Sequence, residues 1–213
     1  YLEGMFPELS PHAERTERSN TEELADFCLP PDYQDQPANN DGLAVPDGAQ
    51  ENVYQYASNV AGQYGHSRIH DIGTGSGSKL VEIFGSWSDT IGTDVPEKLA
   101  RLRIRYPDHQ WDHYTRVIDC DLLLCVDVIE HLDNPRELTQ HIREGRWKHA
   151  VISTPARDLV PGNPPNGPPK NKRHCREWTA DEFAAFLREE FPGYCCDVRV
   201  LGQYNTVATL KRI

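Results

Sequence analysis

A short segment that combines an acid with three glycines has a spacing suited to binding a small molecule. Asp71-Ile72-Gly73-Thr74-Gly75-Ser76-Gly77 follows a short apolar run and precedes a segment of helical periodicity. Glycine permits a tight turn and lets a ligand lie against bare backbone. A dinucleotide site normally has the spacing G-x-G-x-x-G, which holds a pyrophosphate at a helix N-terminus. Here the glycines run G-x-G-x-G behind an acid, which favours a ligand with cationic groups over one with phosphates.

A second acid, Asp94, ends the next predicted strand. A carboxylate at that position can accept hydrogen bonds from both hydroxyls of a ribose. S-adenosylmethionine has a ribose, an ammonium group and a sulfonium group, and it has no phosphate. The turn and the two acids together therefore predict a site for this cofactor.

Two further segments could supply a base for methyl transfer. Glu130 and His131 directly follow an apolar segment that we interpret as a central strand. A hydroxyl acceptor must lose its proton, and histidine titrates near neutrality. His131 and Glu130 are therefore candidate catalytic residues. The alternative is that this pair only caps the following turn.

The second segment, residues 170–179, combines basic residues with a histidine, an acid and an indole. His174 is the second candidate base. Arginine binds carboxylates through two hydrogen bonds and tryptophan offers a flat face, so the segment also suits an oxygen-rich acceptor. We expect four acceptor-binding residues here: Arg173, Arg176, Glu177 and Trp178. The alternative is that Glu177 and Trp178 only dock the helix that follows.

A metal site has one sequence candidate, the closely spaced His109, Asp112 and His113. On a strand, residues 109 and 112 face opposite sides. We therefore predict no metal site.

Strand and helix patterns alternate along most of the chain. Residues 1–49 are rich in Pro, Asn, Asp, Glu and Ser, and we interpret them as an N-terminal arm or leader, partly ordered against a domain of residues 50–213. Capping residues and apolar periodicity predict the remaining elements. Helices are predicted over residues 51–64, 78–85, 97–106, 134–145 and from Thr179, and strands over 67–72, 90–95, 109–114, 121–128, 149–154, 196–203 and 206–213.

This order predicts an α/β fold, a Rossmann-like sheet that is mostly parallel with an antiparallel C-terminal strand and helices on both faces. In such sheets, ligands bind outside the carboxyl ends of the strands, where the strand order reverses. Each candidate segment above lies at such an end. The proline-rich stretch from Pro155 to Cys175 cannot be helix or inner strand, and a loop of this length is usually functional or disordered.

Asp71 to Gly77, Thr93-Asp94 and Val126-Asp127-Val128-Ile129-Glu130-His131-Leu132 resemble the successive motifs of class I S-adenosylmethionine-dependent methyltransferases. The resemblance covers about residues 50 to 213. It implies that the glycine turn borders the methionine moiety, that Asp94 binds the ribose, and that Asp112 contacts the adenine amino group. The cofactor-binding residues expected on this basis are Asp71, Gly73, Thr74, Gly75, Gly77, Asp94, Asp112, Cys125 and Val126.

The stretch His174-Cys175-Arg176-Glu177-Trp178-Thr179 resembles one in small bacterial methyltransferases whose genes accompany glycosyltransferases. This resemblance implies biosynthetic O-methylation of a sugar or glycoside hydroxyl. An N-methyltransferase acting on a small amine, a nicotinamide-dependent oxidoreductase and a non-catalytic scaffold are the alternatives.

Composition disfavours several classes of protein. The net charge is −11, from 22 basic and 33 acidic residues, and no basic cluster has interleaved aromatic residues, which disfavours nucleic acid as a partner. No apolar run approaches the roughly 18 residues needed to cross a bilayer, and we see no signal peptide. None of the six cysteines forms a C-x-x-C pair, so we expect free thiols and a cytoplasmic protein. Since nucleic acid is disfavoured, we expect a small-molecule acceptor.

Overall fold

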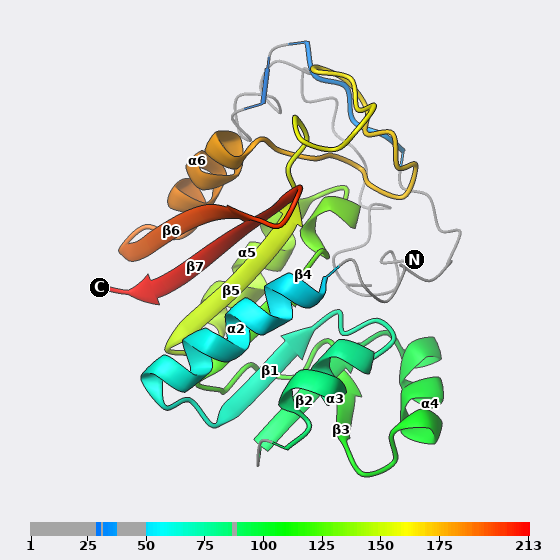
Figure 1. The fold of residues 1–213 in the computed structure, drawn as a ribbon, viewed down its shortest axis with the longest axis vertical. Helices are drawn as coiled ribbons and strands as arrows, with labels where there is room; N and C mark the ends of the chain where they lie inside the picture. Colours follow the sequence, from blue (N-terminus) through cyan, green and yellow to red (C-terminus); the bar gives the residue numbers. More distant parts are fainter. Residues whose placement is uncertain (1–28, 31, 38–49, 87–88) are drawn as a thin grey trace.

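The computed structural model describes residues 29–30, 32–37, 50–86 and 89–213. Most of the predicted arm, including Cys28, lies outside these residues. The described helices and strands are, in chain order, α2 (Glu51–Tyr64), β1 (Arg68–Ile72), α3 (Ser78–Phe84), β2 (Asp89–Asp94), α4 (Pro96–Arg105), β3 (Gln110–His113), β4 (Leu122–Val126), α5 (Pro135–Glu144), β5 (His149–Pro155), α6 (Ala180–Glu190), β6 (Tyr194–Leu201) and β7 (Asn205–Arg212) (Figure 1).

Seven strands form one sheet in the order β3-β2-β1-β4-β5-β7-β6. The first five strands of the chain pair in parallel, and β7 enters antiparallel between β5 and β6. The chain runs outward from β1 through β2 to β3 and then returns to the other side of β1 as β4. The strand order therefore reverses between β1 and β4, and the carboxyl ends of these two strands border the place where ligands bind in such sheets.

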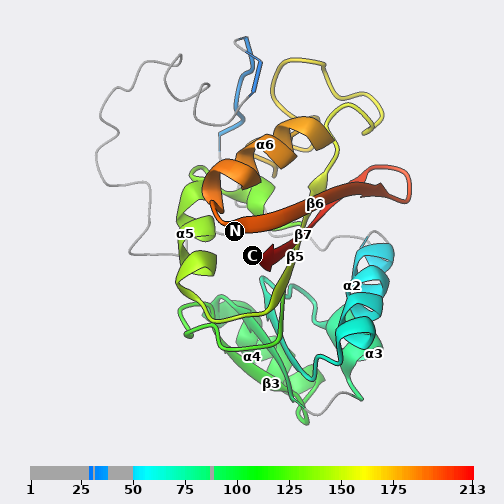
Figure 2. The same ribbon diagram turned by 90° about the vertical axis from the view of Figure 1, so that its left-hand side faces the viewer.

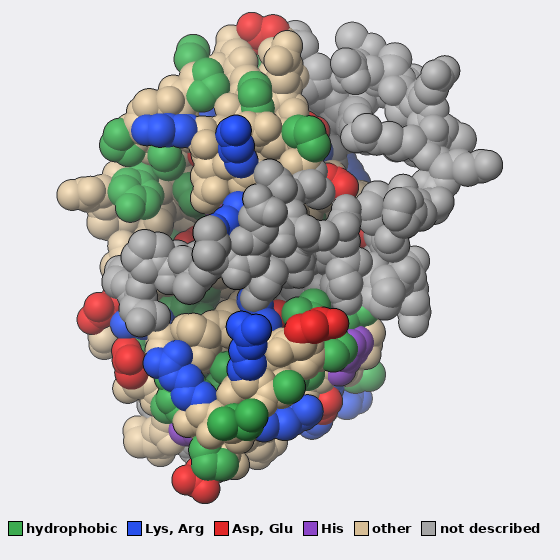
Figure 3. Space-filling model, turned by 90° about the vertical axis from the view of Figure 1, so that its right-hand side faces the viewer, with side chains coloured by type: hydrophobic (Ala, Val, Ile, Leu, Met, Phe, Trp, Pro, Cys, Tyr) green, Lys and Arg blue, Asp and Glu red, His purple; other side chains and the backbone are tan. Residues whose placement is uncertain are grey.

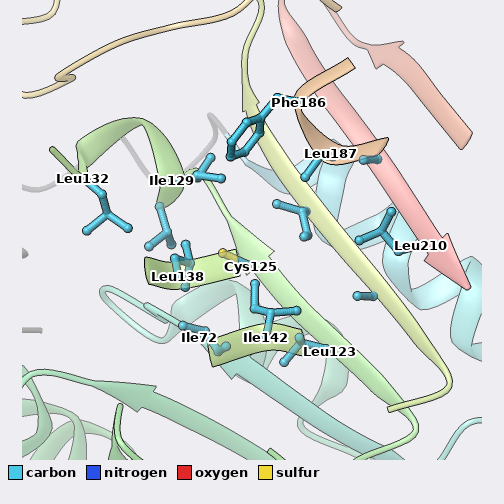
Figure 4. Close-up of a cluster of buried hydrophobic side chains, with 14 of the residues drawn as sticks. Ile72, Leu123, Cys125, Ile129, Leu132, Leu138, Ile142, Phe186, Leu187 and Leu210 are labelled. Atoms are coloured by element: carbon cyan, nitrogen blue, oxygen red, sulfur yellow. The ribbon is translucent and has the colours of Figure 1, made fainter. Parts of the chain in front are cut away.

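Two apolar clusters hold the sheet between layers of helices. One joins α2, α3 and α4 to one face, with fully buried residues such as Val53, Phe84 and Leu124. The other joins α5 and α6 to the opposite face, and Figure 4 shows its centre around Cys125, Ile142 and Phe186. In Figure 2, α2 and α3 lie on one side of the sheet and α5 on the other. All five residues of β4 are buried, as expected for a central parallel strand covered on both faces.

Local signals explain where several helices begin and end. Gly65 adopts a left-handed conformation and ends α2. Thr179 forms the predicted capping box with Glu182, so that each side chain accepts a hydrogen bond from the backbone N–H of the other residue. None of the described helices combines the length and the apolar character needed to cross a membrane.

The predicted α/β architecture is confirmed, with differences of one to three residues at most element ends. The strand expected over 121–128 covers only Leu122–Val126, because Asp127 has a φ of 52° and a 3₁₀ turn follows. Val81 and Ile83, expected to face inward, are half-buried, whereas Leu80 and Phe84 of the same helix are in the core.

At Gly77, which precedes α3, both the backbone conformation and the neighbouring side chains require a glycine, and a substitution tests this requirement. A Cβ atom there would lie 2.7 Å from Leu102 Cδ2 and 2.8 Å from the Trp111 ring, and φ is 71°. Gly193 has a φ of 84° and open space around the position of its Cβ, so it is a matched control. We predict that Gly193→Ala lowers the free energy of unfolding by about 1–2 kcal/mol through the φ penalty alone. Gly77→Ala should cost about 1–3 kcal/mol more, because the added methyl group overpacks the core.

Urea denaturation of both variants measures this difference. Equal losses of stability would contradict the packing role of Gly77.

Candidate functional site

The turn after β1 presents bare backbone at the point where the strand order reverses. Gly73, Gly75 and Gly77 have φ values of 71°, 62° and 71°, a region that side chains rarely adopt. The N–H groups of Gly73 and Thr74 donate to Thr93 O on β2, at 2.8 and 3.2 Å. These bonds fasten the turn to the neighbouring strand and fix its shape.

Asp71 lies in β1 at the base of this turn and is fully buried. Its Oδ2 accepts a hydrogen bond of 2.9 Å from the Tyr54 hydroxyl of α2. Its Oδ1 has no hydrogen-bond partner among the described residues. Burial raises the pKa of Asp71 to about 7. A cation or a hydrogen-bond donor on a ligand would satisfy the open oxygen.

Asp94 ends β2 beside the same turn. Its Oδ1 accepts the N–H of Val95 and its Oδ2 accepts the N–H of Gly75, each at 2.8 Å. The Lys98 ammonium of α4 lies 3.2 Å from Oδ2. Burial raises the pKa of Asp94 to about 6. The carboxylate is therefore held in one orientation against the glycine turn, as a residue that binds ribose hydroxyls requires.

Beyond β4, a second group of side chains gathers from two distant parts of the chain. Glu130 and His131 lie in the 3₁₀ turn after β4, and His174 comes from the long loop that precedes α6. One potential ligand atom from each of these residues lies within 4.8 Å of the other two. The rings of His131 and His174 meet edge to face, with centroids 4.7 Å apart. The structure thus brings together all three residues predicted to be catalytic.

Hydrogen bonds set the tautomer of both histidines. Nδ1 of His131 donates to the carbonyl oxygen of Arg173 at 2.8 Å, and Nδ1 of His174 donates to Oε1 of Glu177. In the neutral ring, each Nε2 then carries a lone pair. The Asn171 side-chain amide donates to Nε2 of His174 at 2.9 Å. Histidines that ligate metals typically have such an Nδ1–H acceptor, which orients the ring and raises its basicity.

The Glu130 carboxylate is fully buried, and neither of its oxygens has a hydrogen-bond partner at normal geometry among the described residues. Burial, followed by the nearby charge of Asp127, raises the pKa of Glu130. Burial also lowers the pKa of His131 to about 3, which keeps that imidazole neutral. A buried carboxylate beside two imidazoles is a donor set suited to a divalent ion that binds nitrogen and oxygen.

This cluster differs from the sequence candidates for a metal site, and sequence reasoning had predicted none. His109 and His113 are not part of the cluster, and Asp112 pairs instead with Arg116 at 2.6 Å. The sequence offered Glu130 and His131 as neighbours, but it gave no sign that His174 would join them.

Asp127 is a further residue of this region to which sequence reasoning assigned no role. It has the one positive φ of a non-glycine residue in the described part of the chain, and such strain is common at functional sites. Its Oδ1 accepts a hydrogen bond of 2.6 Å from Ser153 of β5. The strained backbone turns the chain sharply between β4 and the pair Glu130-His131.

The predicted acceptor-binding residues have unequal access to a ligand. Trp178 is fully buried and packs against Phe183 and Phe186. Arg176 is 1% exposed and forms an ion pair of 2.8 Å with Asp35. Both side chains are used in packing within the domain, and their contact with an acceptor stays a prediction. Glu177 is also buried and holds His174, whereas Arg173 is partly exposed.

The other residues predicted to bind the cofactor differ in whether their side chains are accessible. The side chains of Cys125 and Val126 are buried in the two apolar clusters, so only their main-chain atoms are available at the end of β4. Asp112 lies at the end of β3 beside Thr93 of β2, with 42% of its side chain exposed. Its contact with adenine stays a prediction.

Solved structures share this fold. The chain superposes on the small RNA methyltransferase HEN1 with a TM-score of 0.64 and 21% identity, over 83% of this chain and 27% of that one. It superposes on the 1,6-didemethyltoxoflavin N1-methyltransferase of Burkholderia thailandensis, which binds S-adenosylhomocysteine, with a TM-score of 0.56 and 19% identity, over 76% of this chain and 79% of that one. The fold is that of a class I methyltransferase.

The plantazolicin methyltransferase BamL, also bound to S-adenosylhomocysteine, matches with a TM-score of 0.59 and 11% identity, over 78% of this chain and 85% of that one. No protein-family model matches the chain, and no curated protein does.

The two buried acids make cofactor affinity depend on pH. Asp71 and Asp94 must be ionised to accept hydrogen bonds from hydroxyls or to attract a cation, and burial raises their pKa values to about 7 and about 6. We predict that the affinity for S-adenosylhomocysteine falls as the pH is lowered from about 8 to about 5, because both groups become protonated. Asp94→Asn should weaken binding by about tenfold or more at pH 8 and reduce this pH dependence.

Isothermal titration calorimetry measures these affinities. Asp89→Asn is the control, since Asp89 is an exposed acid at the opposite end of β2. An Asp94→Asn variant that binds as tightly as the Asp89→Asn control would contradict the assignment of Asp94.

Proposed function

We propose that this chain is an S-adenosylmethionine-dependent O-methyltransferase that acts on a hydroxyl group of a small molecule, such as a sugar, with a divalent ion held by Glu130, His131 and His174. The observation that carries the proposal is the pair of neighbouring sites at the carboxyl ends of the strands. One consists of the glycine turn with Asp71 and Asp94. The other is the Glu130-His131-His174 cluster.

The cofactor assignment is supported by the chemistry of the first site. The unpartnered Oδ1 of Asp71 matches a ligand that carries cations, and the fixed carboxylate of Asp94 matches a ribose diol. The three glycines leave the backbone of the turn uncovered by side chains. Two of the structures that share the fold contain S-adenosylhomocysteine, the product of methyl transfer.

The ion is supported by the donor set of the second site. Two imidazoles and one carboxylate would suit divalent manganese, cobalt, iron or zinc, and Glu130, His131 and His174 would hold such an ion. A bound divalent ion supplies Lewis acidity, which lowers the pKa of an oxygen acid that coordinates to it.

The histidines can serve the reaction in one of two ways. Methyl transfer forms the bond between the acceptor oxygen and the methyl carbon, breaks the bond between that carbon and sulfur, and releases the hydroxyl proton. Nε2 of His131, or Nε2 of His174 once the Asn171 amide releases it, can either coordinate an ion or accept that proton, and one lone pair cannot do both. Dependence of the reaction on a divalent ion therefore separates the ligand role from the base role.

The acceptor class rests on the resemblance of residues 174–179 to sugar-associated methyltransferases and on the surface charge near the loop. Lys170 and Lys172 are exposed and Arg173 is partly exposed. Figure 3 shows Lys and Arg side chains mixed with Asp and Glu side chains on one face of the molecule, whose net charge is −11. The basic side chains of the loop itself suit an oxygen-rich or anionic acceptor.

An RNA acceptor is the second candidate, because HEN1, a small RNA methyltransferase, shares the fold. An N-methylated amine is a third, because the toxoflavin enzyme is an N1-methyltransferase. Release of S-adenosylhomocysteine from a panel of glycosides, phenols, amines and single-stranded RNA distinguishes these classes of acceptor. A role in biosynthesis and a cytoplasmic location remain proposals.

We predict that the protein binds Mn²⁺ and that turnover of a hydroxyl acceptor is lost in EDTA and restored by Mn²⁺. Glu130→Gln, His131→Gln and His174→Gln should each weaken Mn²⁺ binding by more than about tenfold, because each removes one ligand. Calorimetric titration of Mn²⁺ and electron paramagnetic resonance provide readouts that do not depend on activity.

His113→Gln is the matched control, because His113 is a partly exposed histidine outside the cluster. Full activity in EDTA without Mn²⁺ binding would contradict the metal proposal and favour a histidine base. Activity only towards amines or RNA would contradict the proposed acceptor.

A further inference from the structure

A short N-terminal segment packs on the long loop that carries His174. Residues 29–30 and 32–37, here called the strap, run beside the loop of residues 156–178 (blue and yellow to orange in Figure 1). Leu29 and Tyr33 are buried in the same apolar cluster as α5 and α6. The strap is thus part of the packed domain, although its sequence gave only the expectation of an arm or leader.

Three strap residues hold the three residues that follow His174. Their backbone and side-chain contacts are short and partly or fully buried. Gln36 N–H donates to Cys175 O at 2.7 Å, an Arg176 guanidinium nitrogen lies 2.8 Å from Asp35 Oδ2, and Glu177 N–H donates to the Tyr33 hydroxyl oxygen at 2.9 Å.

The strap also holds the far part of the loop. The Gln36 side chain donates to Pro169 O at 2.8 Å, and the Asn166 side chain donates to Asp32 at 2.9 Å. The guanidinium group of Arg157 lies 5.3 Å from the centre of the Tyr33 ring. Both ends of the loop are therefore attached to the same segment of eight described residues.

The contact with Glu177 reaches the candidate site through one intermediate residue. Glu177 is fully buried, and its Oε1 accepts the Nδ1–H of His174. Its Oε2 accepts the Asn163 side-chain amide. Tyr33 holds the backbone of Glu177 and thereby sets the position from which this carboxylate orients the imidazole.

We propose that the strap positions the loop that carries His174 and that Tyr33 is a positioning residue for His174, acting through Glu177. The effect of Tyr33 on catalysis rests on the proposed function, because His174 is one of the proposed ion ligands. The orientation of the His174 ring follows from the hydrogen bonds alone and can be measured whether or not an ion binds.

The test compares Tyr33→Phe with Tyr56→Phe in the full chain. Each variant removes one phenol oxygen and keeps the ring. Tyr56 is a matched control, because its hydroxyl pairs with Thr209 Oγ1 at 2.8 Å on a strand away from the loop. Asp35→Ala is a second strap variant, which removes the partner of Arg176.

Nitrogen NMR of the histidine rings reports the tautomer of His174 directly. We expect the wild-type protein and Tyr56→Phe to show the Nδ1–H form, and Tyr33→Phe to show a broadened or mixed signal. We also expect Tyr33→Phe to weaken Mn²⁺ binding by about three- to tenfold, less than the 10- to 100-fold typical of removing a direct partner of a ligand. Binding of S-adenosylhomocysteine should be unchanged, because Tyr33 does not touch the glycine turn.

A solely structural role for the strap would lower the melting temperature of Tyr33→Phe and Asp35→Ala while leaving the His174 signal and the Mn²⁺ affinity unchanged. That result would overturn the inference and leave the proposed function intact. If the wild-type protein binds no Mn²⁺, the metal proposal fails, and the tautomer signal of Tyr33→Phe alone decides the inference about the strap.

Discussion

Two buried carboxylates with oxygen atoms left unpaired among the described residues set the constraint on which the site depends. Oδ1 of Asp71 and both oxygens of Glu130 have no hydrogen-bond partner at normal geometry among the described residues. An ionised carboxylate without a partner in an apolar environment is strongly destabilising, and burial raises the pKa of both groups. Cations brought by ligands would remove this penalty. We therefore interpret Asp71 as a partner of a cationic cofactor and Glu130 as a ligand of a divalent ion.

The fold places these two buried carboxylates at the carboxyl ends of neighbouring strands. Asp71 belongs to β1 and Glu130 follows β4, and these strands are hydrogen-bonded neighbours at the reversal of strand order. Apolar clusters on both faces of the sheet exclude water from the strands themselves. The loop before α6 then adds His174, and the strap holds that loop. The strained backbone of Asp127 is located at the junction of these parts.

The features that were predicted correctly from the sequence are those that depend on short-range patterns. The glycine turn, Asp94 and the capping box of Thr179 each depend on residues a few positions apart, and the structure contains all three features. The joining of His174 to His131 depends on the path of a long proline-rich loop, which no local pattern encodes. The sequence also did not predict which side chains are buried. The mixture of charged and aromatic residues in 173–178 suggested a binding surface, yet Trp178 and Arg176 are in the interior. The sequence suggested an arm partly ordered against the domain, but it could not identify the strap's partners, because its hydrogen bonds to the loop join residues more than 130 positions apart.

A crystal structure of the protein with S-adenosylhomocysteine and Mn²⁺, with anomalous data collected near the manganese edge, tests the central claim most directly. The account predicts one anomalous peak bounded by Glu130, His131 and His174, with the ribose of the ligand on Asp94 and its ammonium group near the glycine turn. An anomalous map without a peak at Glu130 in crystals that contain the bound cofactor product, or a peak at His109 and His113 instead, would contradict it.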